Sequence, residues 1–281
     1  MIVTRFAPSP TGYLHIGNAF AALKAAEAGD RFLVRIEDID TARCREEFVA
    51  AIFEDLRWLG LSWEEPVLRQ SSRFSTYRAA LDTLSNRGLL YPCFCTRKEI
   101  ADEIARAAHA PHGPEGALYP GTCRHLSAEE SAARMATGDA YALRLDVAKA
   151  VDRAGALSFS EQGQGAGGEH GVISAQPELF GDIVLARKEM PASYHLAVVV
   201  DDASQGVTLV TRGADLFAAA HVQRLLQTLL DLPAPSYAHH ALILDEQGKK
   251  FSKRDSAVTL RAMRQAGTTP QDIFARLGAT R

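Results

Sequence analysis

Near the start of the chain stands the stretch Pro8-Ser9-Pro10-Thr11-Gly12-Tyr13-Leu14-His15-Ile16-Gly17-Asn18, between a short apolar strand, Ile2 to Ala7, and an alanine-rich helix, Asn18 to about Ala28. Free N–H groups and the dipole at a helix N-terminus favour a phosphate. The two glycines let the backbone approach a ligand closely, and the prolines stiffen the entry. An ordinary tight turn has a similar composition, so this loop alone does not establish a phosphate site.

A second loop favours the phosphate site over an ordinary turn. It is Lys249-Lys250-Phe251-Ser252-Lys253-Arg254, near the other end of the chain. A triphosphate needs backbone donors and an imidazole on one side and mobile ammonium groups on the other. His15 in the first loop and Lys253 in the second offer these groups, so the two loops together indicate activation of a substrate with ATP.

Strands alternate with helices along the chain, which predicts a parallel sheet wrapped by helices. Arg31 to Glu37 is predicted to be a buried strand that ends in carboxylates, and the carboxyl ends of such strands face the ligand crevice. Residues 46–59 and 72–87 carry apolar side chains at helical spacing, so we expect packing helices there. The apolar run 191–202 ends in two aspartates and predicts a second central strand that terminates at the crevice.

Composition is that of an ordinary globular enzyme, with 281 residues, 47% hydrophobic and 23% charged. No apolar run approaches membrane length and the N-terminus lacks a signal peptide, so we expect a cytoplasmic protein. The 31 basic and 34 acidic residues give a net charge of −3, which excludes a global attraction to nucleic acid. Any contact with a polyanion must come from a local patch, such as Arg43 and Arg45.

Three motifs resemble class I aminoacyl-tRNA synthetases of the glutamyl type. They are R-F-A-P-S-P-T-G-Y-L-H-I-G from Arg5, R-I-E-D-I-D at 35–40 and K-F-S-K at 250–253. The family signatures are H-I-G-H and K-M-S-K-S. Asn18 stands in place of the last histidine and Arg254 in place of the last serine, and the change at Asn18 removes one contact that the signature offers to the nucleotide.

The resemblance implies an α/β fold: a Rossmann-like catalytic domain of the class I aminoacyl-tRNA synthetases with an inserted small domain that binds zinc and is similar to an acceptor-binding domain. We expect residues 1–90 and 181–232 to form the two halves of the catalytic domain. Residues 91–180 form the insertion, and residues 233–281 form the lysine-loop region and C-terminal helices. The glycine-rich stretch 162–168 is too polar to pack well and is predicted to be a mobile part of the insertion.

No anticodon-binding domain is expected, because the chain stops at Arg281, soon after the lysine loop. In this it is similar to the truncated paralogues of the family, which activate L-glutamate with ATP and attach it to queuosine in the anticodon of tRNA(Asp). Residues 270–278 read as a finished helix that begins at proline and ends at glycine. Two alternatives stay open: a catalytic fragment of a conventional glutamyl-tRNA synthetase that charges a tRNA 3′ end, and a non-catalytic paralogue that binds a nucleotide.

The resemblance also implies a set of site residues in a monomeric enzyme. Glutamate is assigned to Arg5, Phe6, Ala7, Pro8, Ser9, Glu37, Tyr194 and Arg212, and ATP with Mg²⁺ to His15, Gly17, Asn18, Lys250, Ser252 and Lys253, with His15 and Lys253 catalytic. Glutamate carries two carboxylates and an ammonium, so two arginines suit the former and Glu37 the latter. Which arginine takes which carboxylate stays open.

Four cysteines without an export signal argue for a metal or free thiols rather than disulfides. Zinc needs about four ligands in tetrahedral geometry. Cys93, Cys95 and Cys123 give three of them, and chemistry alone leaves His125 or His112 as the fourth, or no metal at all. The resemblance implies a different fourth ligand, Tyr119, because the paralogues carry C-x-C followed by Y-x-x-x-C.

Overall fold

The computed structural model describes residues 1–106, 112–243 and 259–278. Its strands are β1 (Val3–Phe6), β2 (Arg31–Ile36), β3 (Glu64–Arg69), β4 (Leu90–Cys93), β5 (His112–Gly113), β6 (Gly116–Ala117), β7 (Ala142–Leu145), β8 (Ser158–Glu161), β9 (Gly171–Ser174), β10 (Val184–Arg187), β11 (Leu209–Gly213) and β12 (Ser236–His240). Its helices are α1 (Ile16–Ala28), α2 (Glu46–Trp58), α3 (Phe74–Asn86), α4 (Arg97–Arg106), α5 (Ala128–Ala136), α6 (Val147–Ala154), α7 (Tyr194–Ser204), α8 (Ala219–Leu229), α9 (Leu260–Gln265) and α10 (Pro270–Leu277). None of the described helices is long and apolar enough to cross a membrane.

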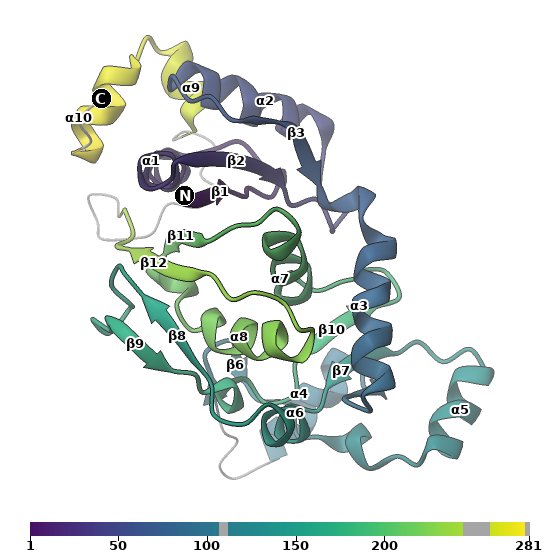
Figure 1. Ribbon diagram of the computed structural model, residues 1–281. Coiled ribbons are helices and arrows are strands. Elements are labelled where there is room, and N and C mark those ends of the chain that lie inside the picture. The colour runs from purple at the N-terminus through teal and green to yellow at the C-terminus, as the bar shows by residue number, and fades with distance from the viewer. Residues whose placement is uncertain (107–111, 244–258, 279–281) are drawn as a thin grey trace.

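Parallel strands form the centre of the molecule, as the sequence predicts. β1 pairs with β2 and β2 with β3, while β11 pairs with β12 and β12 with β8, all in parallel. β11 lies beside β1, where the Thr208 N–H donates to the Val3 carbonyl at 3.0 Å (Figure 1). The first and last thirds of the chain therefore meet at the middle of the fold, and the expected α/β class is confirmed.

Helices pack on both sides of these strands. α1, α2, α9 and α10 share one core, in which Leu23, Ile52, Leu56 and Leu260 have at most 1% of their surface exposed. α3, α7 and α8 share another, which lies below the central strands in Figure 1. The helices predicted at 46–59, 72–87 and 270–278 are confirmed within two residues at each end.

The segment between the two halves contains a separate antiparallel sheet, in the order β10-β7-β4, with the hairpin β5-β6 and helices α4 to α6 around it. β8 and β9 do not join that sheet, because β8 pairs with β12 of the central one. The glycine-rich stretch after β8 is also bound there: the Gln162 N–H donates to the Tyr237 carbonyl at 2.7 Å and the Gln164 N–H to the His239 carbonyl at 3.0 Å. The structure thus differs from the mobile insertion predicted for residues 162–168.

The strand predicted at 191–202 was wrong, because residues 194–204 form the helix α7. Its β-branched run favours a strand, but Ser193 caps the helix by accepting a hydrogen bond from the Leu196 N–H, and α3 and α8 bury it. The two aspartates therefore do not end a strand at the crevice. Asp201 accepts hydrogen bonds from α3 and its flanking turn instead, including one of 2.7 Å from the Tyr77 hydroxyl.

Candidate functional site

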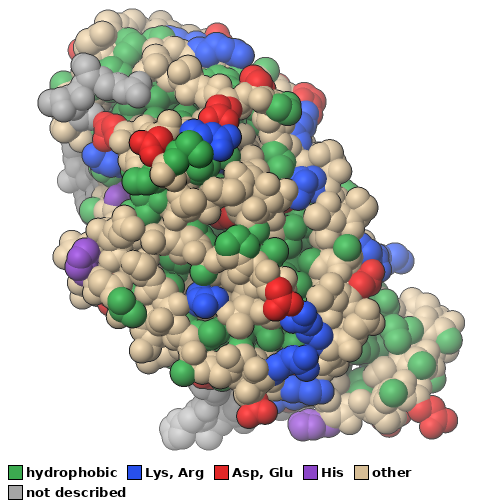
Figure 2. All heavy atoms as spheres, in the orientation of Figure 1, with side chains coloured by type: hydrophobic (Ala, Val, Ile, Leu, Met, Phe, Trp, Pro, Cys, Tyr) green, Lys and Arg blue, Asp and Glu red, His purple; other side chains and the backbone are tan. Residues whose placement is uncertain are grey.

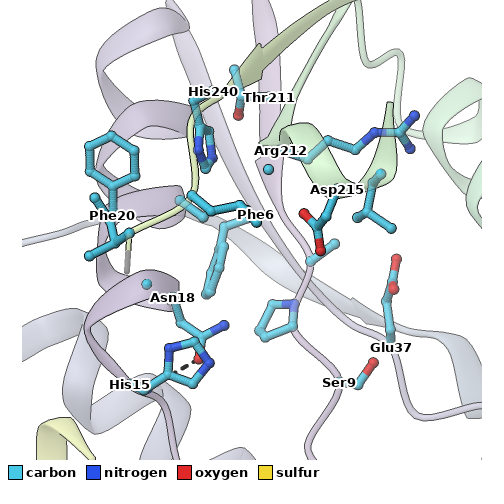
Figure 3. A pocket seen from close by; sticks show the side chains of 18 of the residues that line it. Phe6, Ser9, His15, Asn18, Phe20, Glu37, Thr211, Arg212, Asp215 and His240 are labelled. Atoms are coloured by element: carbon cyan, nitrogen blue, oxygen red, sulfur yellow. Dashed lines mark hydrogen bonds between the residues drawn. The ribbon is translucent and has the colours of Figure 1, made fainter. Parts of the chain in front are cut away.

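A cavity of about 460 Å³ opens where the carboxyl ends of β1, β2, β11 and β12 meet the N-terminus of α1 (Figure 3). This is where an open parallel sheet holds its ligand. All the predicted glutamate residues line it, as do three of the ATP residues. They are Arg5, Phe6, Ala7, Pro8, Ser9, Glu37, Tyr194 and Arg212, with His15, Gly17 and Asn18. Segments more than 200 residues apart in the sequence thus form one site.

The N-terminus of α1 forms one wall of the cavity. His15 is the N-cap residue, with extended backbone, and its N–H donates to the Asn18 Oδ1 at 3.1 Å (Figure 3). A Cβ at Gly17 would lie 3.1 Å from the His15 Nδ1 and Cε1, so glycine leaves room for the imidazole over the first turn. Asn18 therefore closes a capping box that holds His15 at the cavity, a role that the sequence comparison with H-I-G-H did not reveal.

Residues on both sides of the lysine loop lie at the same wall. Leu242 and Ile243 line the cavity, and Thr259 pairs with His15 in an isolated antiparallel bridge. The Leu260 N–H donates to the Leu14 carbonyl at 2.8 Å. The described residues before the lysine loop thus line the cavity, and those after it contact Leu14 and His15. Its predicted ATP residues, Lys250, Ser252 and Lys253, lie outside the described residues.

Arg212 projects from β11 and is 5% exposed. Its Nη1 donates to the Gln223 Oε1 at 2.8 Å and to the Tyr194 hydroxyl at 3.4 Å, and its Nε donates to the His239 Nε2 at 2.9 Å. The Nη2 atom has no hydrogen-bond partner among residues 1–106, 112–243 and 259–278. A buried guanidinium nitrogen of this kind suits an anionic ligand, because an unsatisfied buried donor is costly.

A buried ion-pair chain supports Arg5 and Glu37. The Asp202 Oδ1 accepts from the Arg5 Nε at 3.0 Å and from the Arg35 Nη1 at 2.6 Å, and the Arg35 Nη2 donates to the Glu37 Oε1 at 3.1 Å. Burial alone would raise the pKa of Asp202, but the two arginines hold it below its usual value. Burial raises the pKa of Glu37 against the attraction of Arg35. Glu37 is thus held at the cavity with one arginine partner behind it.

Several lining residues were missed by sequence reasoning. They are Phe20, Ala21, Thr211, Gly213, Asp215, Leu216, His240, Leu242 and Ile243. Phe20 and Ala21 follow Gly17 by three and four positions on α1, a helical spacing that places them on the same face. Asp215 lies within the T-R-G-A-D motif around Arg212. In Figure 3, Glu37 and Ser9 lie on one side of the cavity and His15, Asn18 and Phe20 on the other, with Asp215 between them.

A second cluster brings together Cys93, Cys95, Cys123 and Tyr119. The three sulfur atoms lie within 4.8 Å of one another, and the Tyr119 hydroxyl is 3.4 Å from the Cys93 Sγ and 3.5 Å from the Cys95 Sγ. Ligands at about 2.0–2.3 Å from a tetrahedral zinc have similar mutual separations, so these side chains fit the ion. His125 is exposed and is not part of this group.

Comparison with known proteins identifies the class. The family model described as tRNA synthetases class I (E and Q), catalytic domain, matches residues 1–280. The chain therefore belongs to this family. The expected class I catalytic fold is also seen in a glutamate tRNA ligase from Elizabethkingia meningosepticum, solved in complex with its amino acid, with a TM-score of 0.73 and 28% identity. That match covers 90% of this chain and 52% of the ligase, so the chain spans about half the length of the solved relative.

Two relatives of similar sequence place the chain in a smaller group within this family. A glutamyl-Q tRNA(Asp) synthetase from Rhodobacter capsulatus is 48% identical over 99% of this chain and 100% of the relative. A second one, from Nocardia farcinica, is 45% identical over 97% of this chain and 82% of its own length. Within its family the chain groups with the glutamyl-Q tRNA(Asp) synthetases, as the resemblance of its motifs suggested.

Proposed function

We propose that this protein activates L-glutamate with ATP and transfers the glutamyl group to queuosine at the wobble position of the tRNA(Asp) anticodon. The α-carboxylate of glutamate attacks the α-phosphorus of ATP and pyrophosphate leaves. A hydroxyl of the acceptor then attacks the carbonyl carbon of the mixed anhydride and releases AMP. The similarity to glutamyl-Q synthetases over 97% or more of this chain supports the choice of acceptor, and the shared cavity supports the chemistry.

Glutamate fits the side of the cavity that holds Glu37, Arg5 and Arg212. The carboxylate of Glu37 suits the ammonium group, since it keeps one face toward the cavity while Arg35 binds it from behind. Arg212 offers its Nη2 to a carboxylate, and Tyr194 lies beside it. Arg5 lines the same wall and supplies the second positive charge.

ATP fits the opposite side, at the α1 N-terminus. His15 serves as hydrogen-bond donor to the phosphate oxygens on which charge grows, and Lys253, with Lys250 and Ser252, neutralises the departing pyrophosphate. Positioned donors of this kind supply most of the acceleration in phosphoryl chemistry. Mg²⁺ binds mainly through the triphosphate. The observation that supports this division is that Leu242 and Ile243, before the lysine loop, line the cavity, and that Thr259, after it, pairs with His15.

Cys93, Cys95, Cys123 and Tyr119 would hold one structural zinc ion. The ion would tie the end of β4 to the turn at Cys123 within the inserted segment. Arg144 lies over the Tyr119 ring, 3.8 Å from its centroid, and this cation–π contact holds the ring in place beside the sulfur atoms. We place the enzyme in the cytoplasm, where its tRNA substrate is, and as a monomer, since one chain supplies every residue assigned to the site.

Contact with tRNA requires a local patch of Lys and Arg side chains, because the net charge of the whole chain is −3. Figure 2 shows Lys and Arg side chains gathered on the lower right of the face drawn, while positive and negative groups alternate over its upper part. Such a patch can track phosphates without making the whole molecule attractive to nucleic acid.

One assay separates this function from a synthetase that charges a 3′ end. The protein is incubated with ATP, labelled glutamate and tRNA pools that contain or lack queuosine. We expect label on tRNA(Asp) only when queuosine is present. Label on the 3′ end of tRNA(Glu) would contradict the proposed acceptor, and the absence of both label and pyrophosphate exchange would contradict the activation step.

A further inference from the structure

Two buried residues stand behind Arg212 without lining the cavity. His239 lies opposite Arg212 in the β11–β12 pairing, and Glu161 ends the neighbouring strand β8. The side chains of both are 0% exposed. Neither was assigned a role from the sequence, and neither belongs to the cavity wall.

The direction of each hydrogen bond in this group is fixed by chemistry. Arginine can only donate, so the 2.9 Å contact from the Arg212 Nε requires the His239 Nε2 to accept. The neutral ring then carries its proton on Nδ1, which donates to the Glu161 Oε2 at 2.5 Å. Burial lowers the pKa of His239, and this favours the neutral ring.

Glu161 is itself held in place by backbone donors. Its Oε1 accepts from the His239 N–H at 2.9 Å and from the Gly163 N–H at 2.8 Å. A Cβ at Gly163 would lie 2.2 Å from the His239 carbonyl oxygen, so only glycine allows this approach. The glycine-rich stretch therefore fixes the carboxylate against β12.

We propose that Glu161 and His239 are positioning residues, which set the imidazole tautomer so that the guanidinium of Arg212 is oriented with its Nη2 available for a substrate carboxylate. The inference rests on the proposed binding of glutamate by Arg212. It assigns to the glycine-rich stretch a part in the specificity for an anionic amino acid. Neither residue touches the substrate.

The hydrogen bonds from Glu161 through His239 to Arg212 form a relay. Glu161→Gln tests this relay with almost no change in the shape of the side chain. The glutamine oxygen keeps the two backbone hydrogen bonds, so its NH₂ group faces the His239 Nδ1 and forces the proton to Nε2. Two donors then face each other at Arg212. We expect the KM for glutamate in glutamate-dependent pyrophosphate exchange to rise about 10- to 100-fold, with the KM for ATP unchanged.

Glu169→Gln is the matched control, because Glu169 lies on the same β8–β9 connection, is exposed and makes no hydrogen bond to His239. Its glutamate KM should equal that of the wild type. His239→Glu added to Glu161→Gln removes the tautomer conflict, since a carboxylate accepts both from the new amide at position 161 and from the Arg212 Nε. The double variant should therefore bind glutamate better than Glu161→Gln alone, which a purely structural role would not produce.

Two further measurements distinguish a failure of the relay from a failure of the proposed glutamate site. Long-range ¹H–¹⁵N spectra of the wild type should show His239 protonated at Nδ1 only, and a proton at Nε2 at neutral pH would overturn the relay even if the variants failed to fold. Arg212→Ala should raise the glutamate KM at least as much as Glu161→Gln. If Arg212→Ala raises it and Glu161→Gln does not, the relay fails alone; if Arg212→Ala leaves it unchanged, the glutamate site itself is wrong.

Discussion

At the scale of single residues, the site depends on buried charges that hold one another in place. Arg35 is fully buried and joins Asp202 to Glu37, although it does not line the cavity. Removing one partner of such a group leaves an uncompensated buried charge, which costs more than the pair contributes. Glu37 and Arg5 thus owe their positions to residues that no substrate contacts.

Asn18 is predicted to act through the helix cap as well as through the nucleotide. Replacing it with alanine removes the acceptor for the His15 N–H and should destabilise the fold by about 0.5–1 kcal/mol, measured by urea unfolding. Asn18→Asp keeps the acceptor and should unfold like the wild type, while its charge raises the KM for ATP. An alanine variant with the wild-type unfolding midpoint would contradict the capping role.

Asp55 gives a prediction about pH. It lies on α2 with no exposed surface, and burial raises its pKa to about 6, against the attraction of Arg264 on α9. Because the folded pKa exceeds the unfolded value of 3.8, the folded state binds the proton more tightly. Its contribution to stability is therefore greatest at low pH and falls as the pH rises from about 4 through about 6.

Asp55→Asn should remove that dependence. At pH 7.5 the variant should be more stable than the wild type by on the order of 2 kcal/mol, and the difference should shrink at pH 4.5. Urea unfolding of both proteins at the two pH values measures it, and taking the difference cancels the titration of other groups. A difference that grows toward low pH would mean that the carboxylate is stabilised in its ionised form.

At the scale of elements, the sequence was most informative where local pattern and tertiary burial agree. The helices at 46–58 and 74–86 and the strands at 3–6 and 31–36 follow from apolar periodicity and turn residues. The helix α7 does not, because its valine-rich run favours a strand and only packing against α3 and α8 decides for the helix.

The sequence also predicted those residues of the candidate site that lie within a motif. The signature loops pointed to Arg5, His15 and Glu37 because each stands at a fixed place in a motif. Glu161 and His239 could not be found, since their role comes from the pairing of β8 with β12, which brings together strands that are far apart in the sequence. Glycine-rich composition suggested mobility at 162–168, where backbone hydrogen bonds instead fasten the chain.

The cysteine cluster makes a separate prediction for the inserted segment. Wild-type protein should contain one zinc ion per chain by atomic absorption, and a chelator should lower its melting temperature. Cys123→Ser should contain less zinc, because it removes one of four ligands. Cys44→Ser makes the same substitution outside the cluster and should retain the ion. Equal metal content in the two variants would contradict the site.

At the scale of the whole molecule, the fold brings the two ends of the chain to one cavity. The strands of the first third meet those of the last third between β1 and β11, and α9 returns the chain to the first core beside α2 (Figure 1). The N-terminal loop with His15 and the flanks of the lysine loop are thereby placed at the same wall. Activation of glutamate requires these two segments to act on a single nucleotide.

Pyrophosphate exchange measures whether His15 and Lys253 act on the same ATP. Glutamate-dependent exchange is measured with and without tRNA for His15→Ala, Lys253→Ala and, as a control, Lys149→Ala on the distant helix α6. Each of the first two variants should exchange about 100- to 1,000-fold more slowly than the wild type while melting at the same temperature, because each removes one donor to the phosphates. Exchange at the wild-type rate by Lys253→Ala would contradict a role of the lysine loop in activating glutamate.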